Sequence, residues 1–570
     1  MSRQRIAFLV VLLLHASLLA WSALRISVAF DESAHLPAGL SYWRHAQFDI
    51  FSSTPPLPRL LGSWPALLLS PSIPDIDKFK TVPPEARPFL YAEMFLNENR
   101  GQYRRIFLFS RLGIIVVSCI GCWLVYHWAS RLYDPTAALI PAAAYALCPN
   151  IIAHGSIVGT DMPTAVAMTA ALYAWWRFCS DQTIKRWVLA TLLVALSMLC
   201  KQTAILLWGG MLIMAWSLIP RRRVAWSRFS MAYIGTVLAT LILVNAGYLF
   251  QASFKPLAEY KFTSPRFQSL QARVPGLRLP LPAPLVEGSD MISMEMQNGF
   301  SAYLLGEQYF GSKWYYFPIA LLCKLPIATM MLLAWALLSI GQWLPPRVTL
   351  TNSERAVGVT CVFYLLFCMF LGNMNVGVKY LLPIFPIAFL LLGRVGVVLK
   401  EHASNARIGA LAIVAALAIE VLAIAPRFMS FVNVAWGGPT RAYTVINDCN
   451  IDWGQSLIDL KSWMAESKVK RLQLCYFGMV DPTVYGIDYI PLTKNSDDSY
   501  IGISSFFMTG MAQRLHTQDG ASGWVQIPFY RELQRTTPVA VVGDTIFIFK
   551  REDFEAANRE YQAAQSLGRI

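Results

Sequence analysis

Three side chains that can do acid–base or metal chemistry, Asp31, Glu32 and His35, stand close together in the stretch VAFDESAHLPAGLSYW, residues 28–43. They directly follow an apolar segment near residues 6–28, which is long enough to cross a membrane. A carboxylate at the mouth of a membrane helix can serve as a general base for a substrate held at head-group depth. The same residues also fit a helix start, because Asp is a common N-cap and acidic side chains are favoured in a first helical turn.

Asp31, Glu32 and His35 are also the candidate ligands of a divalent metal cation. Glu32 and His35 lie one helical turn apart, as metal ligands on one helix face would. No second Glu/His pair follows on the same face. A lone pair of this spacing is more often a hydrogen-bonded helix start than a ligand set, and both interpretations stay open here.

A second acid, Asp161, stands in the stretch GTDMPTA, residues 159–165, between two further apolar segments. If the apolar segments cross a membrane in turn, Asp161 comes to the same membrane face as Asp31. An Asp before a Pro near the first helical turn is also a typical helix N-cap, and the two roles are compatible.

Four cations lie in apolar surroundings, and these are Arg59 in TPPLPRLL, Lys201 in LCKQTA, Lys324 in LLCKLPIA and Lys379 in NVGVKYLLPIFP. A lysine inside a membrane span costs about 2.5–3.5 kcal/mol on insertion scales, so one that persists lines a cavity or extends to the head groups. Acids beside cations at one membrane face indicate a substrate with a lipid phosphate and a hydroxyl to be activated.

The composition is that of a membrane protein. The chain has 570 residues, of which 55% are hydrophobic and 14% charged, whereas soluble domains carry about 25% charged residues. The formal net charge of +14 does not indicate nucleic-acid binding, because the basic residues form short clusters between apolar runs rather than a stripe between aromatic residues.

The elements that must position the reactive residues are helices. We expect about eleven membrane spans, near residues 6–28, 107–128, 136–153, 163–179, 187–200, 203–219, 231–250, 314–340, 356–372, 380–399 and 408–425. The basic clusters between them all fall on one side, which predicts a cytoplasmic N-terminus and an outer C-terminus.

Residues 1–425 are therefore predicted to form a membrane domain, with outer loops at 30–106 and 251–313. Within the second loop, EMQNGFSAYLLG is predicted to be helical. Residues 426–570 differ in composition: VKRLQLCYFG, GWVQIPFYREL and PVAVVGDTIFIFKRED alternate like strands, and GQSLIDLKSWMAES has helical spacing. The predicted fold is an α-helical polytopic membrane protein with a small C-terminal soluble α/β domain.

Cysteine usage adds one open question. Eight of the ten cysteines lie in or beside apolar runs without metal-ligand spacing, which favours packing roles. Cys449 and Cys475 fall in the hydrophilic region, so a disulfide between them is an alternative to two free thiols if that region is exported.

Several motifs, in this order along the chain, resemble one family. They are FDESAHLPAGLSYW, STPPLPRLLGSWP, CPNIIAHGSIVGTDMPTA, NAGYLF with FKPL, YLLGE with WYYFPIALLCKLP, NVGVKYLLPIFP, and NVAWGGPTRAYTVINDCNIDWGQSLIDLK. From about residue 6 to residue 490 the chain resembles the GT-C glycosyltransferases that use polyprenyl-phosphate sugars, and within them the bacterial branch similar to protein O-mannosyltransferases.

The resemblance implies roles for individual residues. Asp31, with Glu32 beside it, corresponds to the acid pair that supplies the base, and Asp161 corresponds to the acid of the second outer loop. The family's basic residues that hold the donor phosphate correspond to Arg59, Lys201 and Lys379.

Lys324, from its position in the span, is expected to join these phosphate-binding cations. The residues expected to line the substrate are His35, Tyr42, Pro56 and Tyr380. The family usually has a His before its Pro-Pro-Leu, and this chain has Thr54 there. That departure weakens the case for a metal and leaves His35 and His154 as nearby imidazoles.

The predicted function is transfer of a sugar, such as mannose or another hexose, from a polyprenyl phosphate to an acceptor hydroxyl, with inversion at the anomeric carbon. The expected partners are the lipid-linked donor, a protein, lipid or glycan acceptor, and membrane lipids, with no nucleic acid. The expected location is the inner membrane of a bacterium, with the C-terminus extracytoplasmic.

Two other function classes stay open. A carrier or flippase for lipid-linked sugars would also need outer cations, but it is expected to show two related halves, and the sequence has no internal repeat. A binding or scaffold protein would work through its C-terminal tail. There, Asp448, Asp452, Trp453 and Gln455 either bind an acceptor saccharide or form a turn and helix cap that docks the tail.

Overall fold

The computed structural model of the chain describes residues 2–220, 222–346, 349–373, 375–401, 404–514 and 523–567. Helices form most of it. Up to residue 424 they are α1 (Arg3–Arg25), α2 (Glu32–His45), α3 (Leu57–Ser63), α4 (Arg87–Asn99), α5 (Tyr103–Leu132), α6 (Leu139–Ala146), α7 (Pro149–Gly155), α8 (Asp161–Ser180), α9 (Ile184–Met198), α10 (Leu206–Leu218), α11 (Arg223–Gly247), α12 (Pro265–Arg273), α13 (Ala283–Asn298), α14 (Tyr316–Lys324), α15 (Ile327–Ile340), α16 (Asn352–Phe370), α17 (Ile384–Leu390), α18 (Gly393–Glu401) and α19 (Ser404–Ile424).

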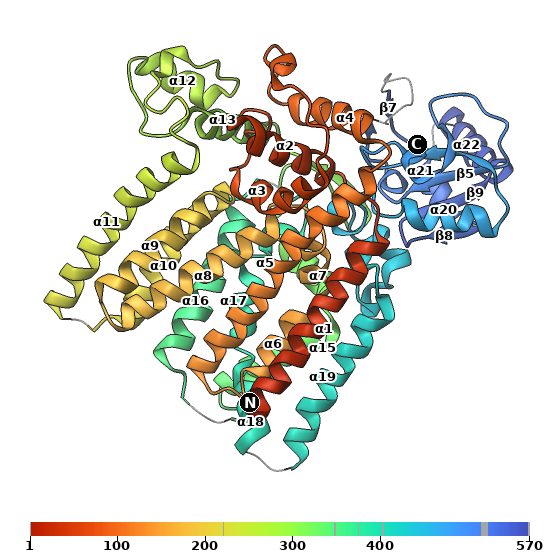
Figure 1. The fold of residues 1–570 in the computed structure, drawn as a ribbon. Helices are drawn as coiled ribbons and strands as arrows, with labels where there is room; N and C mark the ends of the chain where they lie inside the picture. The colour runs from red at the N-terminus through yellow and green to blue at the C-terminus, as the bar shows by residue number, and fades with distance from the viewer. Residues whose placement is uncertain are drawn as a thin grey trace.

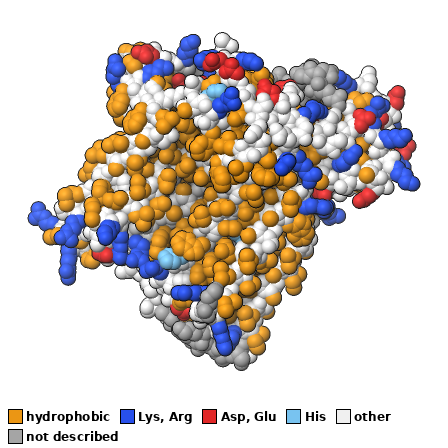
Figure 2. Space-filling model, in the orientation of Figure 1, with side chains coloured by type: hydrophobic (Ala, Val, Ile, Leu, Met, Phe, Trp, Pro, Cys, Tyr) orange, Lys and Arg blue, Asp and Glu red, His pale blue; other side chains and the backbone are white. Residues whose placement is uncertain are grey.

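The chain is an integral, multi-pass membrane protein. Five described helices are long and apolar enough to cross a membrane, and these are α1, α5, α11, α16 and most of α19. The bent pair α14 and α15 would make a sixth span. Figure 2 shows hydrophobic side chains across the middle of the visible face, where such helices would contact lipid. The other predicted spans also lie on helices, but those do not pass the same test, so the count of about eleven stays a prediction.

The outer loops gather at the end of the molecule opposite the N-terminus, together with the C-terminal region (Figure 1). Loop 30–106 contains α2, α3 and α4, and loop 251–313 contains α12 and α13. In the second loop the helix prediction for EMQNGFSAYLLG is wrong beyond Asn298. Gly299 has a φ of +72°, which ends α13, and the chain continues into an antiparallel ribbon of β1 (Ser301–Leu304) and β2 (Glu307–Phe310).

The C-terminal region is built around a five-stranded mixed sheet in the order β4-β3-β5-β9-β8. Its strands are β3 (Arg471–Cys475), β4 (Asp488–Pro491), β5 (Tyr500–Ser504), β8 (Ala540–Val542) and β9 (Ile546–Lys550). β3 pairs in parallel with β4 and β5, and β9 runs antiparallel to β5 and β8. The α/β prediction for this region is therefore confirmed.

The helices of this region are α20 (Leu457–Glu466), α21 (Tyr530–Arg535) and α22 (Arg551–Ser566). The predicted helix in GQSLIDLKSWMAES is α20. The strand expected in GWVQIPFYREL is only partly present: β7 (Trp524–Val525) pairs with β6 (Gln513–Arg514), and the rest of the stretch leads into α21. The thiols of Cys449 and Cys475 are free, so the alternative of a disulfide between them is wrong.

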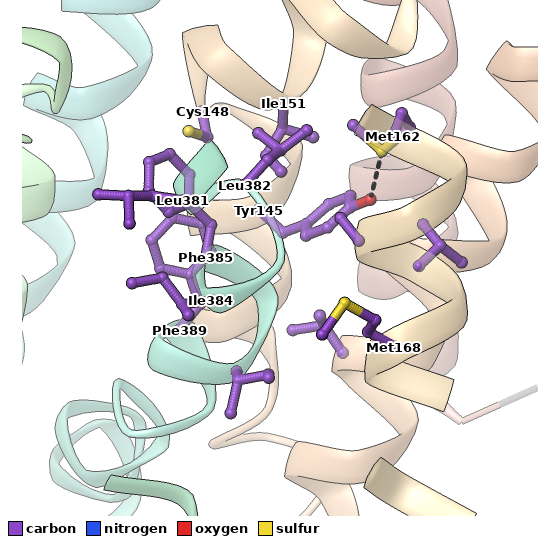
Figure 3. Packing of buried hydrophobic residues seen from close by; sticks show 14 of the residues in the cluster. Tyr145, Cys148, Ile151, Met162, Met168, Leu381, Leu382, Ile384, Phe385 and Phe389 are labelled. Atoms are coloured by element: carbon purple, nitrogen blue, oxygen red, sulfur yellow. Dashed lines mark hydrogen bonds between the residues drawn. The ribbon is translucent and has the colours of Figure 1, made fainter. Parts of the chain in front are cut away.

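The hydrophobic core beneath the outer loops joins the segments that carry two of the predicted site residues. Tyr145 of α6 lies between Met162 of α8 and Leu382, just before α17, and its hydroxyl contacts the Met162 sulfur at 3.6 Å (Figure 3). Asp161 directly precedes Met162, and Lys379 lies one turn before Leu382. The same packed core thus joins the two segments that carry these charged residues.

Glu420, an acid within the apolar helix α19, accepts hydrogen bonds at the start of α15. α14 and α15 meet at an angle of 114° next to Pro326, which leaves the first backbone N–H groups of α15 without helical partners. The Glu420 carboxylate on α19 accepts hydrogen bonds from the N–H groups of Ile327 at 3.1 Å and Ala328 at 3.5 Å. A negative side chain at a helix N-terminus is also electrostatically favoured.

We expect the substitution Glu420→Ala to lower the free energy of unfolding by about 1–3 kcal/mol, because it leaves buried N–H groups unpaired. Glu420→Gln keeps one acceptor oxygen and should lose clearly less. Thermal unfolding of the purified variants in detergent measures the difference. Equal losses in the two variants would show that Glu420 does not act as the cap.

Candidate active site

A cavity of about 440 Å³ lies among the outer loops and the C-terminal region. Its wall includes Asp31 at the start of α2, Asp161 at the start of α8, Lys201 before η3 (Gln202–Ile205), Lys379 in η5 (Val378–Leu381), and Trp453 from the C-terminal region. Segments far apart in sequence therefore supply the charged groups that the sequence singled out.

The two acids and two lysines form two ion pairs. Lys201 Nζ lies 2.6 Å from Asp161 Oδ1, and Lys379 Nζ lies 3.4 Å from Asp31 Oδ2. Each ammonium also lies over an aromatic ring, that of Lys201 4.6 Å from the centroid of Tyr380 and that of Lys379 4.2 Å from the centroid of Trp453. Cation–π contacts of this kind are electrostatically favourable, more so in a desolvated site.

Neither acid is used as a helix cap. Asp31 occupies the N-cap position of α2 but makes no side-chain capping hydrogen bond, and the N-cap of α8 is Thr160, one residue before Asp161. The Asp31 side chain keeps 35% of its surface accessible, against 7% for Asp161. Asp31 is thus the better placed of the two to meet a substrate.

Glu32, predicted to act beside Asp31, points away from the cavity. Its carboxylate forms a two-pronged ion pair with Arg111 of α5, at 2.9 Å from Nε and 2.7 Å from Nη2. It also accepts hydrogen bonds from the backbone N–H groups of Ala29 and Val158. With both oxygens engaged and 1% of its surface exposed, Glu32 is structural rather than catalytic.

Arg59 is likewise buried, with hydrogen bonds to other protein groups, and does not line the cavity. Its guanidinium donates to the carbonyl oxygens of Thr54 and Pro55, to the Thr54 hydroxyl and to the Tyr42 hydroxyl. Its Nε donates to Nδ1 of His35 at 3.2 Å. Thr54, which replaces the family's usual His, is therefore a partner of Arg59.

His35 lines the cavity as predicted. Burial, together with the neighbouring Arg59 guanidinium, holds the pKa of His35 well below its ordinary value of 6.5. The ring is therefore neutral, and because Nδ1 accepts a hydrogen bond, its proton is on Nε2. His35 can donate one hydrogen bond to a substrate in the cavity.

Of the other predicted residues, Tyr380 lines the cavity and Tyr42, Pro56 and Lys324 do not. Tyr42 is buried and donates to the Phe51 carbonyl. Lys324 is buried beneath the C-terminal region, where its ammonium donates to the carbonyl oxygens of Met429 and Asn450. The prediction of Lys324 as a phosphate-binding residue is thus not supported by its position.

The residues proposed as metal ligands do not form a ligand set. Glu32 is paired with Arg111, and Nδ1 of His35 is engaged by Arg59. Within the described part of the chain, no group of three His, Cys, Asp or Glu side chains is arranged to hold a metal ion. Asp31, Glu32 and His35 therefore do not fit a metal centre, and the chemistry below uses none.

An apolar groove of about 280 Å³ adjoins the cavity, and sequence reasoning did not identify it. Ser53, Thr54, Lys201, Glu295 and Tyr380 line both. The rest of the groove is mostly apolar, with Ile205, Leu206, Ile292, Met296, Phe317 and Phe367 on its wall. Its residues come from separate loops and helices. The only signal for it in the sequence is therefore Lys201, a charged residue in an apolar run.

The stretch around Trp453 both docks the C-terminal region onto the first loop and contributes to the cavity wall. The Trp453 carbonyl accepts from the N–H of Phe30, and the Gln455 carbonyl accepts from the N–H of Ser27. The Asp452 carboxylate accepts from Gly454 N–H and the Ser505 hydroxyl. This stretch is therefore a turn that docks the C-terminal region onto the first loop, and it also brings Asp448 and Trp453 to the cavity.

Comparison with known proteins gives one family match. The model of the dolichyl-phosphate-mannose-protein mannosyltransferase family matches residues 107–248, from α5 to the end of α11. No curated protein matches the chain. The family match confirms the resemblance predicted from the motifs, and with it the prediction of a glycosyltransferase.

Solved structures similar to this chain are also found. ArnT from Cupriavidus metallidurans bound to undecaprenyl phosphate has 13% identity and a TM-score of 0.46, with 95% of this chain and 97% of that chain covered. The Archaeoglobus fulgidus oligosaccharyltransferase in its apo form has 11% identity and a TM-score of 0.45, with 91% of this chain and 74% of that chain covered.

We expect Glu32→Gln to lower the free energy of unfolding by about 3–5 kcal/mol, because it leaves the buried Arg111 guanidinium without its counter-charge. Thermal unfolding in detergent measures this. Asp77→Asn is the matched control: it breaks the Asp77–Lys80 pair, whose side chains are 65% and 60% exposed, and should leave the melting temperature unchanged. A stable Glu32→Gln protein without sugar transfer would restore a catalytic role for Glu32.

Proposed function

We propose that this chain transfers a sugar, mannose or a related hexose, from a polyprenyl phosphate to an acceptor hydroxyl, with inversion at the anomeric carbon. The observation that carries the proposal is the junction of two environments: a polar cavity with Asp31, Asp161, Lys201 and Lys379 opens onto an apolar groove. A lipid-linked phosphosugar has both parts, an apolar chain and a charged phosphate beside the reactive carbon. The match to a family of dolichyl-phosphate-mannose-dependent enzymes supports the same donor class.

In this proposal the isoprenoid chain of the donor lies in the groove, against Ile205, Leu206 and Phe367. Burial of apolar area there stabilises the complex by about 25 cal/mol per Å². Lys201 stands where groove and cavity meet, so the donor phosphate comes to its ammonium, and the sugar extends into the cavity toward Asp31.

The reaction then needs a base and stabilisation of the leaving group. Asp31 takes the proton from the acceptor hydroxyl, whose oxygen attacks the anomeric carbon from the side opposite the phosphate. The bond between that carbon and the phosphate oxygen breaks, and its electron pair leaves with the polyprenyl phosphate. Lys201 and Lys379 offset the charge that develops on the phosphate, and Asp161 holds Lys201 in place.

The orientation follows from the charge pattern. In this proposal the end of the molecule that carries the N-terminus is cytoplasmic, because the basic clusters between the apolar segments favour that orientation under the positive-inside rule. The cavity and the C-terminus then face the outer side, and the bacterial character of the motifs favours an inner membrane. The acceptor in this proposal is a hydroxyl group on a protein, lipid or glycan.

The direct test is transfer of radiolabelled mannose from a polyprenyl-phosphate mannose to solubilised membrane acceptors by the purified protein. We expect Asp31→Asn to reduce the rate of transfer by about 10²–10⁴-fold, because it removes the base. Expression should not change, and the melting temperature and binding of the polyprenyl phosphate should change little, because Asp31 makes no capping hydrogen bond and its pair with Lys379 is long, at 3.4 Å, with an Asp31 side chain that is 35% exposed.

Asp161→Asn is the companion variant. It should lose donor affinity, because the short pair that holds Lys201, at 2.6 Å, is gone, whereas Asp31→Asn breaks only the longer and more exposed pair with Lys379 and should lose clearly less. A stable Asp31→Asn protein that transfers sugar at the wild-type rate would exclude Asp31 as the base.

Lys201→Met should weaken binding of the polyprenyl-phosphate donor by about 10- to 100-fold, the worth of one charge-assisted hydrogen bond. Lys201→Arg should restore little of it, because a planar guanidinium does not replace a compact ammonium. Lys313→Met is a matched control, since Lys313 also pairs with an acid, Glu307, and lies over a tyrosine ring, but lines neither cavity nor groove. Equal donor affinity in Lys201→Met and Lys313→Met would refute the phosphate assignment.

A further inference from the structure

Four phenylalanine rings in contact with one another line the part of the cavity that is not shared with the apolar groove. Phe477 stacks on Phe506 with a centroid distance of 4.0 Å and on Phe30 at 5.3 Å, and Phe89 of α4 meets Phe30 edge-on at 5.7 Å. All four rings line the cavity, and none of them lines the groove. Two of the four come from the C-terminal region, which thus forms much of this wall.

The described wall of the cavity carries more acids than cations. Among the described residues that line the cavity, the cations are Lys201 and Lys379 and the acids are Asp31, Glu85, Asp161, Glu295 and Asp448. Lys201 belongs to the groove side, and Lys379 is already paired with Asp31 and covered by Trp453. Glu85, just before α4, and Asp448 form no ion pair among the described residues, although Lys379 lies close enough to Asp448 to lower its pKa.

Asp448 is held in an unusual backbone conformation at this wall. Its φ is +60°, a left-handed value that non-glycine residues adopt uncommonly. The neighbouring Asn447 amide fixes the turn by donating to the carbonyl oxygens of Ser505 and Phe506 and to the Thr509 hydroxyl. Among the described residues, only the N–H of Cys449 donates to the Asp448 carboxylate. An acceptor oxygen is therefore left for a ligand.

We propose, building on the function proposed above, that the C-terminal region forms the acceptor half of the active site. Asp448 accepts a hydrogen bond from the acceptor, and the acceptor carries an aromatic or other apolar group beside its reactive hydroxyl and no negative charge close to it. The partly buried rings of Phe30 and Phe89 contact the apolar group, and the buried rings of Phe477 and Phe506 support them from behind.

The charges on this wall exclude an anionic acceptor. A phosphate or carboxylate near the reactive hydroxyl would lie among Asp31, Glu85 and Asp448, and the Lys379 ammonium, which acts on the donor phosphate in the function proposed above, would not be free to neutralise it. A neutral or cationic acceptor meets no such repulsion. The charge of the donor phosphate is offset by Lys201 and Lys379.

The protonation of Asp448 gives the proposal a pH signature. Burial raises the pKa of Asp448 to about 6, with Lys379 lowering it and Asp31 raising it further. The carboxylate is thus charged above pH 6 and becomes protonated as the pH falls through 6. Acceptor binding through Asp448 should weaken over the same range.

The test uses the full-length protein in detergent, a radiolabelled polyprenyl-phosphate mannose, and three acetylated tripeptide amides as acceptor probes: Phe-Ser-Phe, Lys-Ser-Lys and Glu-Ser-Glu. The Phe and Lys probes should be used at least about tenfold better, in kcat/KM, than the Glu probe. Asp448→Asn should raise the acceptor KM, leave the donor KM unchanged, and abolish the decline of kcat/KM below pH 6.

Two outcomes would overturn the inference and leave the proposed function intact. One is transfer in which the Glu probe is used as well as the Phe probe. The other is an Asp448→Asn protein whose donor KM changes while its acceptor KM does not, which would mean that Asp448 acts only through Lys379.

Phe89→Ala provides a second variant, since Phe89 is only partly buried: it should raise the KM for the Phe probe and not for the Lys probe. Failure of transfer both to the peptides and to solubilised membrane acceptors would instead count against the proposed function.

Discussion

The buried ion pair between Glu32 and Arg111 holds the rest of the site together. Arg111 on α5 also donates to the carbonyl oxygens of Ala23, Ile26 and Ser27, where α1 ends, and Glu32 accepts from the N–H of Val158. One interaction thus fixes the end of α1, the start of α2 and the turn before α8. Asp31 and Asp161 lie directly beside these points, so their separation is set by a pair that takes no part in the chemistry. Removing two charges from water is costly, and the cost is offset because almost every oxygen and nitrogen of the pair is hydrogen-bonded.

Charges at membrane depth are tolerated here because each has a specific partner. Lys201 pairs with Asp161, Lys379 with Asp31, and Lys324 with backbone carbonyl oxygens. Only the first two pairs lie in a cavity, where a phosphate can compete with the carboxylate for the ammonium. The same residue type, in the same apolar context, thus lines a cavity in one place and only stabilises the fold in another.

The C-terminal region completes the cavity rather than standing apart from it. Trp453 lies over the Lys379 ammonium while its carbonyl accepts from Phe30, so the docking contact and the active-site contact belong to one residue. A Cβ at Gly377 would come within 2.5 Å of the Cys449 sulfur, which shows how closely this region packs against the segment that carries Lys379. Binding of substrate and docking of this region are therefore physically linked.

The sequence by itself determined the membrane class, the α/β character of the C-terminal region and the set of charged residues from which the site is drawn. Hydropathy and side-chain period are local properties, and a charge in an apolar run is visible without a structure. What only the tertiary structure decided is the role of each charge. Arg59 and Glu32 looked like Lys201 and Asp31 in sequence, but contacts with Thr54 and Arg111 engage them inside the protein. Such contacts join segments distant in the chain, and no local pattern encodes which acid meets which cation.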